Sequence, residues 1–454
     1  MITRLEPLAS IGYSQGGAPL LPEIRPENTV FALVCFEGPD RYSSAGGLGV
    51  RVTELSAELA ARGFSTHVYF VGDPALPAEE ALADGRLVYH RWGQWISKYY
   101  PRGVYDGERE KLYDFTSSLP HTILEGLARP TCAAGQHLVV LSEEWHTAST
   151  ACNISDALHG AGLRDQALLL WNANNTMGFE QVDFARLRYT QTLTTVSHWM
   201  KHLMWNWGCN PVVIPNGIPA RLLEHSGEVD YLGGRLREAL GDRLLLSKVA
   251  RFDPDKRWNG AMEAVAEMRR MGLSPLLIMK GGIEAHGAEV LHHADNLGLQ
   301  VHHVFADDRN PESCLRAICE ASHGADVLNV RFFVPENLLR ALYRASDVML
   351  ANSGREPFGL VGLEVMASGG VAFTGATGEE YAKSFENAIV IETDDPREVA
   401  AAAAHLRANP ALAAALRHRG RETAREYTWA RVIDFLKIRL QFLGLAQGWG
   451  VSRG

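Results

Sequence analysis

The sequence predicts an α/β protein built from two doubly wound domains. Short apolar runs with the length of buried strands alternate with helical patterns along most of the chain. The chain has 454 residues, more than one hydrophobic core usually organises. The alternation restarts in the second half. We therefore expect residues 1–215 and 216–430 to form two domains, and a helix in residues 431–454 to pack back on the first.

The first half opens with a strand, a glycine-rich loop, a helix and a second strand, which together form a βαβ unit. In such a unit, glycines let the main chain approach a ligand at the helix start, so Gly46 and Gly47 are candidate binding residues. A tight turn without a ligand explains a glycine pair equally well. The elements lie at residues 30–36, at 43–49, around the apolar face of Val52, Leu55 and Leu59, and at 67–71.

An aromatic-rich segment follows, between Tyr89 and Phe115. Aromatic faces stack on sugar rings, although packing within the protein is the more common role of such residues. If this segment is a functional loop that contacts a ligand, Trp95 and Tyr99 are the candidate contacts.

A strand pattern at residues 137–141 runs into the polar segment Ser142-Glu-Glu-Trp-His-Thr147. A histidine just past a strand end can hydrogen-bond a sugar hydroxyl or a backbone carbonyl, so His146 has a functional and a structural interpretation. A further apolar run lies at residues 167–171.

The second half repeats the alternation, which indicates a second doubly wound sheet. Just after its first strand, Arg251 and Lys256 flank a turn made by Asp253 and Pro254. The turn either aims a guanidinium fork and an ammonium at one diphosphate, or is a solvated basic turn paired with nearby aspartates. The strand patterns lie at residues 244–250, 276–280, 301–305, 326–330 and 347–351.

Two carboxylates, Glu356 and Glu364, follow the last of these strands. The helical spacing after Pro357 places Glu356 in a strand-to-helix loop and Glu364 about two turns into the helix. A helix cap and an ordinary surface glutamate would give the same spacing. The position at the carboxyl end of a strand favours a ligand site instead. The N–H groups of the helix start then predict an anion site at Phe358, Gly359 and Leu360.

Composition and charge narrow the classes of protein. The formal charge of −9 argues against a general nucleic-acid binder, so a phosphate site would be a local basic pocket. Residues 1–28 lack the apolar core of a signal peptide and no later run has transmembrane length, which leaves peripheral membrane contact open. Six scattered cysteines fit a reducing cytoplasm best. No cluster with metal-ligand spacing occurs, so we expect no metal.

The segment Glu356-Pro-Phe-Gly-Leu with Glu364 resembles the Glu-x7-Glu signature of the retaining glycosyltransferases of family four (group 1), relatives of glycogen and starch synthases with the GT-B fold. Further segments resemble motifs of this family in the expected order, so the resemblance covers nearly the whole chain after residue 29. They are Gly46-Gly-Leu48, Glu144-Trp-His-Thr147 and Arg251-x4-Lys256. One departure is Ser44, where starch and bacterial glycogen synthases carry a lysine; it favours the broader family over an ADP-glucose-dependent polymer synthase.

The resemblance implies two Rossmann-like domains facing across a cleft. It also implies transfer of a hexosyl group, with retention, from a nucleoside-diphosphate sugar to a hydroxyl of a saccharide or small hydrophilic acceptor. His146 and Glu356 would be catalytic, with no cofactor beyond the nucleotide-sugar co-substrate, and Trp95 and Tyr99 would contact the acceptor. The donor-binding residues would be Gly46, Gly47, Arg251, Lys256, Phe358, Gly359, Leu360 and Glu364.

Other functions stay open beside this one. They are glucan elongation of the glycogen-synthase type, a GT-B sugar-nucleotide epimerase and a non-catalytic sugar-nucleotide sensor. The intact set of Arg251, Lys256, Glu356 and Glu364 argues against the sensor. A dinucleotide oxidoreductase is disfavoured because no Gly-x-Gly-x-x-Gly with a ribose-binding acid follows the first strand.

Overall fold

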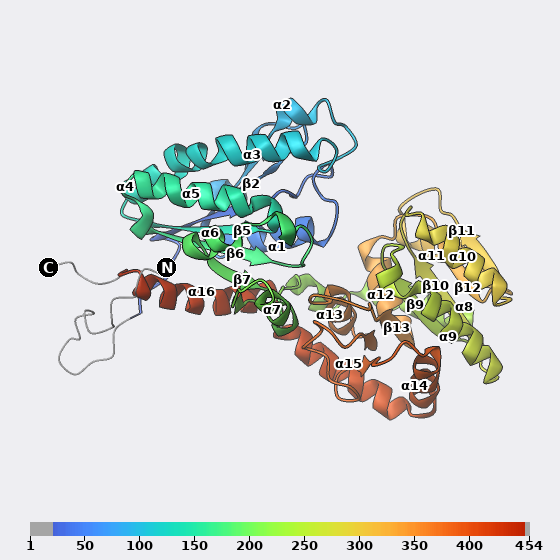
Figure 1. Cartoon of the computed structure of the whole chain (residues 1–454). Coiled ribbons are helices and arrows are strands. Elements are labelled where there is room, and N and C mark those ends of the chain that lie inside the picture. The colour runs from blue at the N-terminus through green and yellow to red at the C-terminus, as the bar shows by residue number, and fades with distance from the viewer. Residues whose placement is uncertain (1–20, 450–454) are drawn as a thin grey trace, which may run out of the picture. The chain divides into compact units, whose positions relative to one another are not determined.

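The structure is a computed structural model that describes residues 21–449 (Figure 1). The chain forms two compact α/β units. Unit 1 comprises Met1–Gly217 and Trp429–Gly454, and unit 2 comprises Ile218–Thr428. The expected domain ends, residues 215 and 430, each lie two residues from the observed ends at Gly217 and Thr428. The prediction that residues 1–28 lack a signal peptide falls mostly on residues 1–20, which lie outside the described residues.

Unit 1 is built on an eight-stranded sheet with the order β3-β4-β2-β1-β5-β6-β7-β8. Neighbouring strands are parallel except the antiparallel edge pair β3 and β4. The chain leaves β1 toward β2 on one side and later enters β5 on the other, so the topological switch point lies between β1 and β5. The strands are β1 (Thr29–Val34), β2 (Ser65–Val71), β3 (Glu79–Leu82), β4 (Leu87–Trp92), β5 (His137–Glu143), β6 (Ala167–Ala173), β7 (Thr192–Thr195) and β8 (Val212–Val213).

Helices cover both faces of this sheet, and successive strand residues point to opposite layers. Phe31 and Leu33 of β1 pack in the layer of α1 and α16, whereas Val30 and Ala32 pack in the layer of α3 and α5. The C-terminal helix α16 thus completes the core of unit 1. The helices are α1 (Gly47–Ala61), α2 (Gln94–Ser97), α3 (Glu108–Ile123), α4 (Arg129–Ala133), α5 (Ala148–Gly160), α6 (Phe184–Thr190), α7 (His198–Trp205) and α16 (Trp429–Ala446).

Unit 2 is built on a seven-stranded sheet with the order β11-β12-β10-β9-β13-β14-β15, and all its pairs are parallel. Its switch point lies between β9 and β13. Leu246 packs with α9, α10 and α14, and Leu245 packs with α8, α11 and α12. The strands are β9 (Leu244–Val249), β10 (Pro275–Lys280), β11 (Val301–Val304), β12 (Val327–Val330), β13 (Val348–Ala351), β14 (Ala372–Thr374) and β15 (Ile389–Val390).

The helices of unit 2 are α8 (Gly227–Leu240), α9 (Trp258–Arg270), α10 (His286–Asn296), α11 (Pro311–Ala321), α12 (Glu336–Ala345), α13 (Leu360–Ala367), α14 (Pro396–Ala408) and α15 (Pro410–Arg425). The structure therefore confirms the predicted fold class of two doubly wound α/β domains, and each predicted strand of unit 2 is present within one residue at both ends. No helix within residues 21–449 has the length and apolar composition required to cross a membrane.

The aromatic segment differs from its prediction as a loop. Residues 92–115 contain α2 and the first half of α3, so Tyr113 and Phe115 are helical. Gly93 and Gly107 adopt left-handed backbone conformations, φ 64° and 68°, at the N-caps of these two helices. A side chain at residue 107 would also collide with the ring of Tyr100. Each helix of this segment thus begins at a glycine whose backbone conformation other residues rarely adopt.

Candidate active site

In unit 2, residues predicted for the donor site and for catalysis gather at the switch point between β9 and β13. The ammonium Nζ of Lys256, after β9, lies 2.7 Å from Oε2 of Glu356, in the loop after β13. Lys256 Nζ also donates a hydrogen bond to Ser353 Oγ at 3.2 Å. The Lys256 and Glu356 side chains are 21% and 23% exposed, so this ion pair is partly desolvated yet open to solvent. The fold thus brings together two residues that lie 100 positions apart.

Local structure holds the loops that carry this pair. Asp253 caps the short helix η8 (Pro254–Lys256) by accepting the N–H of Asp255 at 2.9 Å, and Pro254 occupies the first helical position. The backbone N–H of Gly354 donates to the carbonyl of Asp255 at 2.7 Å. This hydrogen bond ties the loop of Glu356 to the turn of Lys256.

Arg251 does not join the pair in this structure. It is exposed, and its side chain makes no hydrogen bond or ion pair within residues 21–449. The charge of Arg251 acts on Glu284. Partial burial opposes the ionisation of Glu284, but the N–H of Phe252 and the charge of Arg251 keep the pKa of this carboxyl lowered. Arg251 is therefore a cation available to an anionic ligand at the end of β9.

The start of α13 has the properties expected of an anion site. Its N-cap, Gly359, has φ 79°, and no side chain caps the first N–H groups. A Cβ at this position would lie 2.4 Å from Cγ of Glu379 and 3.1 Å from the hydroxyl of Tyr381. The backbone conformation and the close packing both require glycine, and the uncapped N–H groups stay open to a phosphate.

The structure places the side chain of Phe358 away from solvent. Its side chain is 5% exposed and packs against the rings of Tyr381 and Tyr427, with centroid distances of 5.9 and 6.0 Å. Phe358 therefore belongs to the core beneath the helix start, and only its main chain can meet a donor. Leu360 is the first residue of α13 and is partly exposed.

Two further carboxyl groups of unit 2 are poorly solvated. Glu364 lies on α13, accepts a hydrogen bond from the Tyr343 hydroxyl at 3.4 Å, and has its pKa raised to about 7 by burial. Glu379, which we did not predict, is 4% exposed and accepts hydrogen bonds only at Oε2, from the N–H and hydroxyl of Thr377 at 3.2 Å each. Burial, assisted by the charge of Glu356, raises the pKa of Glu379 to about 7. The glycine-rich segment 374–379 was the sequence signal for it.

In unit 1, a carboxylate occupies the predicted anion position at the start of α1. Oε2 of Glu37 accepts the N–H groups of Ala45, Gly46 and Gly49 at 3.2, 3.0 and 3.1 Å. A ligand anion would therefore have to displace Glu37. Neither Gly46 nor Gly47 has a positive φ, and a Cβ at either would meet nothing within 4 Å. Local packing does not require these glycines, so they leave open space beside the helix start.

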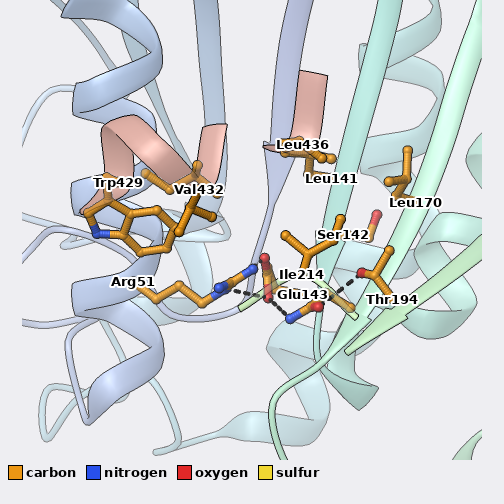
Figure 2. A pocket seen from close by; sticks show the side chains of 12 residues that line it. Arg51, Leu141, Ser142, Glu143, Leu170, Thr194, Ile214, Trp429, Val432 and Leu436 are labelled. Carbon is orange, nitrogen blue, oxygen red and sulfur yellow. Dashed lines mark hydrogen bonds and ion pairs between the residues drawn. The ribbon is translucent and has the colours of Figure 1, made fainter. Parts of the chain in front are cut away.

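A buried polar cluster lies at the unit 1 switch point, beside a small cavity of about 20 Å³ (Figure 2). Arg51 on α1 donates through Nε to both carboxylate oxygens of Glu143, at 3.1 and 3.2 Å. Asn172 and Asn174 each donate to Glu143 Oε2 at 2.9 Å, and Asn216 accepts a hydrogen bond from Arg51. We assigned no role to these residues, because partners so distant in sequence have no spacing signal.

Glu144 is the most strained residue of this region. It has φ 68° and ψ 169°, a combination that is rare for residues other than glycine. Its buried carboxyl accepts the N–H of Asn174 at 2.7 Å through Oε1, and Oε2 has no hydrogen-bond partner. Burial, with the nearby charge of Glu143, raises its pKa to about 8. Strain of this kind is concentrated at functional sites.

His146, predicted as catalytic, is 5% exposed and packed among aromatic rings. Its ring stacks on those of Phe36 and Trp145, with centroid distances of 4.5 and 3.8 Å. Nε2 lies 2.7 Å from Glu108 Oε1, and Nδ1 is buried without a partner. Burial lowers its pKa against the influence of Glu108, so the ring favours the neutral form. In this conformation the ring of His146 is part of the aromatic packing of unit 1.

The candidate acceptor residues are at the surface of unit 1. Trp95 and Tyr99 are 62% and 71% exposed, and the ammonium of Lys98 lies 5.4 Å from the Tyr99 ring centroid. Packing therefore uses little of either ring. The described residues contain no group of three or more His, Cys, Asp or Glu side chains placed to hold a metal ion.

Comparisons with known proteins agree with this architecture. Residues 236–426 match the model for glycosyl transferases group 1, and residues 45–222 match the model for glycosyltransferase family 4. A D-inositol 3-phosphate glycosyltransferase of Geodermatophilus obscurus is 26% identical over 423 residues, which are 86% of this chain and 84% of the relative.

Solved structures share the fold at lower sequence identity. Sucrose-phosphate synthase of Thermosynechococcus elongatus aligns with TM-score 0.63 and 20% identity over 92% of this chain and all of that chain. A UDP-forming α,α-trehalose-phosphate synthase of Burkholderia xenovorans, in complex with glucose-6-phosphate, aligns with TM-score 0.63 and 15% identity over 91% of this chain and all of that chain.

These findings define an enzyme of the glycosyltransferase class with the GT-B fold. The two family models lie one in each half of the chain, as the motif order requires. The chain belongs to the group 1 glycosyltransferases, with a family 4 N-terminal part.

Proposed function

We propose that this enzyme transfers a hexosyl group, with retention of configuration, from a nucleoside-diphosphate sugar to a hydroxyl group of a small hydrophilic acceptor. The observation that carries the proposal is the Lys256–Glu356 pair beside the uncapped start of α13. These groups lie at the switch point of a parallel sheet, where ligands bind. The cation and the free N–H groups suit the diphosphate of such a donor, and the carboxylate suits the hydroxyl groups of its sugar.

We assign the donor diphosphate to Lys256, Arg251 and the N–H groups near Gly359 and Leu360. Their positive charge stabilises the leaving nucleoside diphosphate as the glycosidic bond breaks. Glu356 faces the sugar, and Glu364 accepts hydrogen bonds from ribose hydroxyls. This division needs no metal and no cofactor beyond the co-substrate.

UDP is the first nucleotide to test, since the Burkholderia xenovorans neighbour is described as UDP-forming. That neighbour holds glucose-6-phosphate, and the Geodermatophilus obscurus relative is named for D-inositol 3-phosphate. Both compounds are small and rich in hydroxyl groups. We therefore propose a sugar, a cyclitol or one of their phosphates as acceptor, with Trp95 and Tyr99 contacting it. All six cysteines are free, which favours a reducing cytoplasmic location.

The proposal gives His146 a supporting role through its ring stack and its hydrogen bond to Glu108. Phenylalanine at this position keeps the stacking but removes the ring nitrogens. If His146 acts on substrate, His146→Phe lowers kcat in a protein with an unchanged melting temperature. If its role is packing, His146→Phe keeps kcat and His146→Ala loses thermal stability.

The direct test is a donor screen that measures release of the nucleoside diphosphate with and without candidate acceptors. We expect release to require both a nucleotide sugar and an acceptor, and NMR of the product to show the anomeric configuration of the donor. An inverted product would refute retention. Release of free sugar and nucleotide without an acceptor would indicate the epimerase-like alternative, polymer growth would indicate glucan elongation, and binding without turnover would indicate a sensor.

A further inference from the structure

Lys248 is a buried lysine that the assignments above leave without a role. It lies on β9, the strand whose end carries Arg251 and Lys256, and is 1% exposed. Its Nζ donates a hydrogen bond to Asn352 Oδ1 at 2.9 Å and lies 5.5 Å from the ring centroid of Trp258. Within residues 21–449, the structure pairs Lys248 with no carboxylate.

An ammonium in such a place is costly, because burial removes its hydration and no opposite charge replaces it. Two neighbouring cations, Lys256 and Arg257, add repulsion, and only Glu356 favours the charge. Burial is the largest influence, and the pKa of Lys248 is lowered to about 7. The free protein near neutral pH is therefore a mixture of charged and neutral Lys248.

Lys248 is connected to the candidate donor site through the loop after β13. Its acceptor, Asn352, precedes Ser353, whose hydroxyl accepts a hydrogen bond from Lys256. Lys256 in turn pairs with Glu356. A lysine whose only function was to fill space at this point of the strand would be replaced at lower cost by an apolar residue, such as the leucines of β9.

We propose that Lys248 is a proton-accepting residue of the donor site: when a nucleoside diphosphate binds, Nζ takes up a proton that the acid form of the buffer gives up, and the resulting ammonium stabilises the diphosphate from within the sheet. This inference rests on the proposed function, since it requires the diphosphate to bind beside Lys256. Lys248 acts through the electrostatic field and through Asn352 rather than by touching the substrate.

The proposal has a defined pH dependence. A bound anion raises the pKa of Lys248, so binding takes up a proton and affinity falls as pH rises through the pKa of the free protein. If the free pKa is about 7 and the bound pKa lies well above 8, binding takes up about half a proton at pH 7 and weakens about tenfold from pH 6 to pH 8.

Other groups titrate in the same range. The terminal phosphate of UDP ionises near pH 6, and the carboxyl groups of Glu364 and Glu379 have pKa values of about 7. The informative quantity is therefore the difference between the wild-type protein and Lys248→Met, which removes only the amine and has a similar side-chain length.

The experiment is calorimetric titration of the full-length protein with UDP at pH 6, 7 and 8, in two buffers of different ionisation enthalpy, after thermal unfolding has shown that each variant is folded. We expect wild type to take up about half a proton more than Lys248→Met at pH 7. Asn352→Asp keeps the lysine but gives it a permanent counter-ion, so it should also lose the extra uptake.

Equal proton uptake by wild type and Lys248→Met, with UDP bound to both, would overturn the role of Lys248 and leave the donor site intact. Should Lys248→Met fail to fold, unchanged proton uptake in Asn352→Asp would overturn it instead. Failure of the wild-type protein to bind UDP, ADP or GDP would overturn the proposed function, and this inference with it.

Discussion

Replacing Glu356 with glutamine should tighten the binding of a free nucleoside diphosphate, although the residue is proposed to belong to the active site. In the structure the ammonium of Lys256 is held by Glu356 at 2.7 Å. An incoming diphosphate must compete with this carboxylate for Lys256 and is also repelled by it. Glutamine removes the competing charge and keeps the shape of the side chain.

The two partners of this pair should respond with opposite signs. Partly exposed ion pairs contribute about 0.2–1 kcal/mol, so Glu356→Gln should lower the Kd for UDP by about 1.5- to 5-fold. Lys256→Met removes a hydrogen bond to a charged group worth about 1.5–3 kcal/mol, so it should raise the Kd by about 10- to 150-fold. With the full nucleotide sugar, Glu356→Gln should lower kcat, because it loses the carboxylate that faces the sugar.

Calorimetry with UDP at pH 8 and low ionic strength measures both effects. Glu386→Gln is the matched control, since Glu386 is an exposed acid of the same unit paired with Lys383 rather than with a site residue. It should leave the Kd unchanged. Weaker UDP binding by Glu356→Gln, or unaltered binding by Lys256→Met, would refute the competition between carboxylate and diphosphate.

Three further predictions follow from the geometry. Gly359→Ala should destabilise the protein more than Gly369→Ala in thermal unfolding. Both force alanine into the left-handed region, at about 1–2 kcal/mol, but only a Cβ at 359 meets a buried side chain, at 2.4 Å; equal losses would contradict the clash. Glu364→Gln should raise Tm at pH 8 and change it little at pH 5. Because the pKa of Glu364 is raised to about 7, the stability that comes from its protonated carboxyl is present at low pH and lost as pH rises through 7. An equal gain in Tm at both pH values would refute this. Trp95→Ala and Tyr99→Ala should raise the acceptor KM without changing Tm, as both rings are exposed; a lower Tm with normal kinetics would mean that they pack.

The fold and half of the candidate site could be predicted from the sequence, because both depend on where strands end. Apolar runs located the strands of unit 2, and residues that follow β9 and β13 must meet at the sheet edge. Lys256 and Glu356 were found in this way. The short strands β14 and β15, with three and two residues, were missed because runs of that length have no periodicity to detect.

The remaining features depend on side-chain packing that no local pattern records. The carboxylate of Glu37 accepts hydrogen bonds from N–H groups at the start of α1 and from the hydroxyl of Tyr105, which is distant in sequence. Arg51 and Glu143 are 92 positions apart, and each alone resembles an ordinary charged residue. Lys248 was read as part of an apolar strand, since a single lysine does not disturb the pattern of β9.

The return of α16 to unit 1 determines the order in which the two cores can form during synthesis. Unit 2 is continuous, from Ile218 to Thr428, so it has its whole core once its last residue has left the ribosome. Unit 1 begins first but needs Trp429, Ile433 and Leu440 to close the core around β1 and β5. The N-terminal half must therefore wait, with part of an apolar sheet face covered by α1 and the rest uncovered, until α16 is made. A nascent chain that stops before α16 is expected to carry one folded unit and one that depends on chaperones.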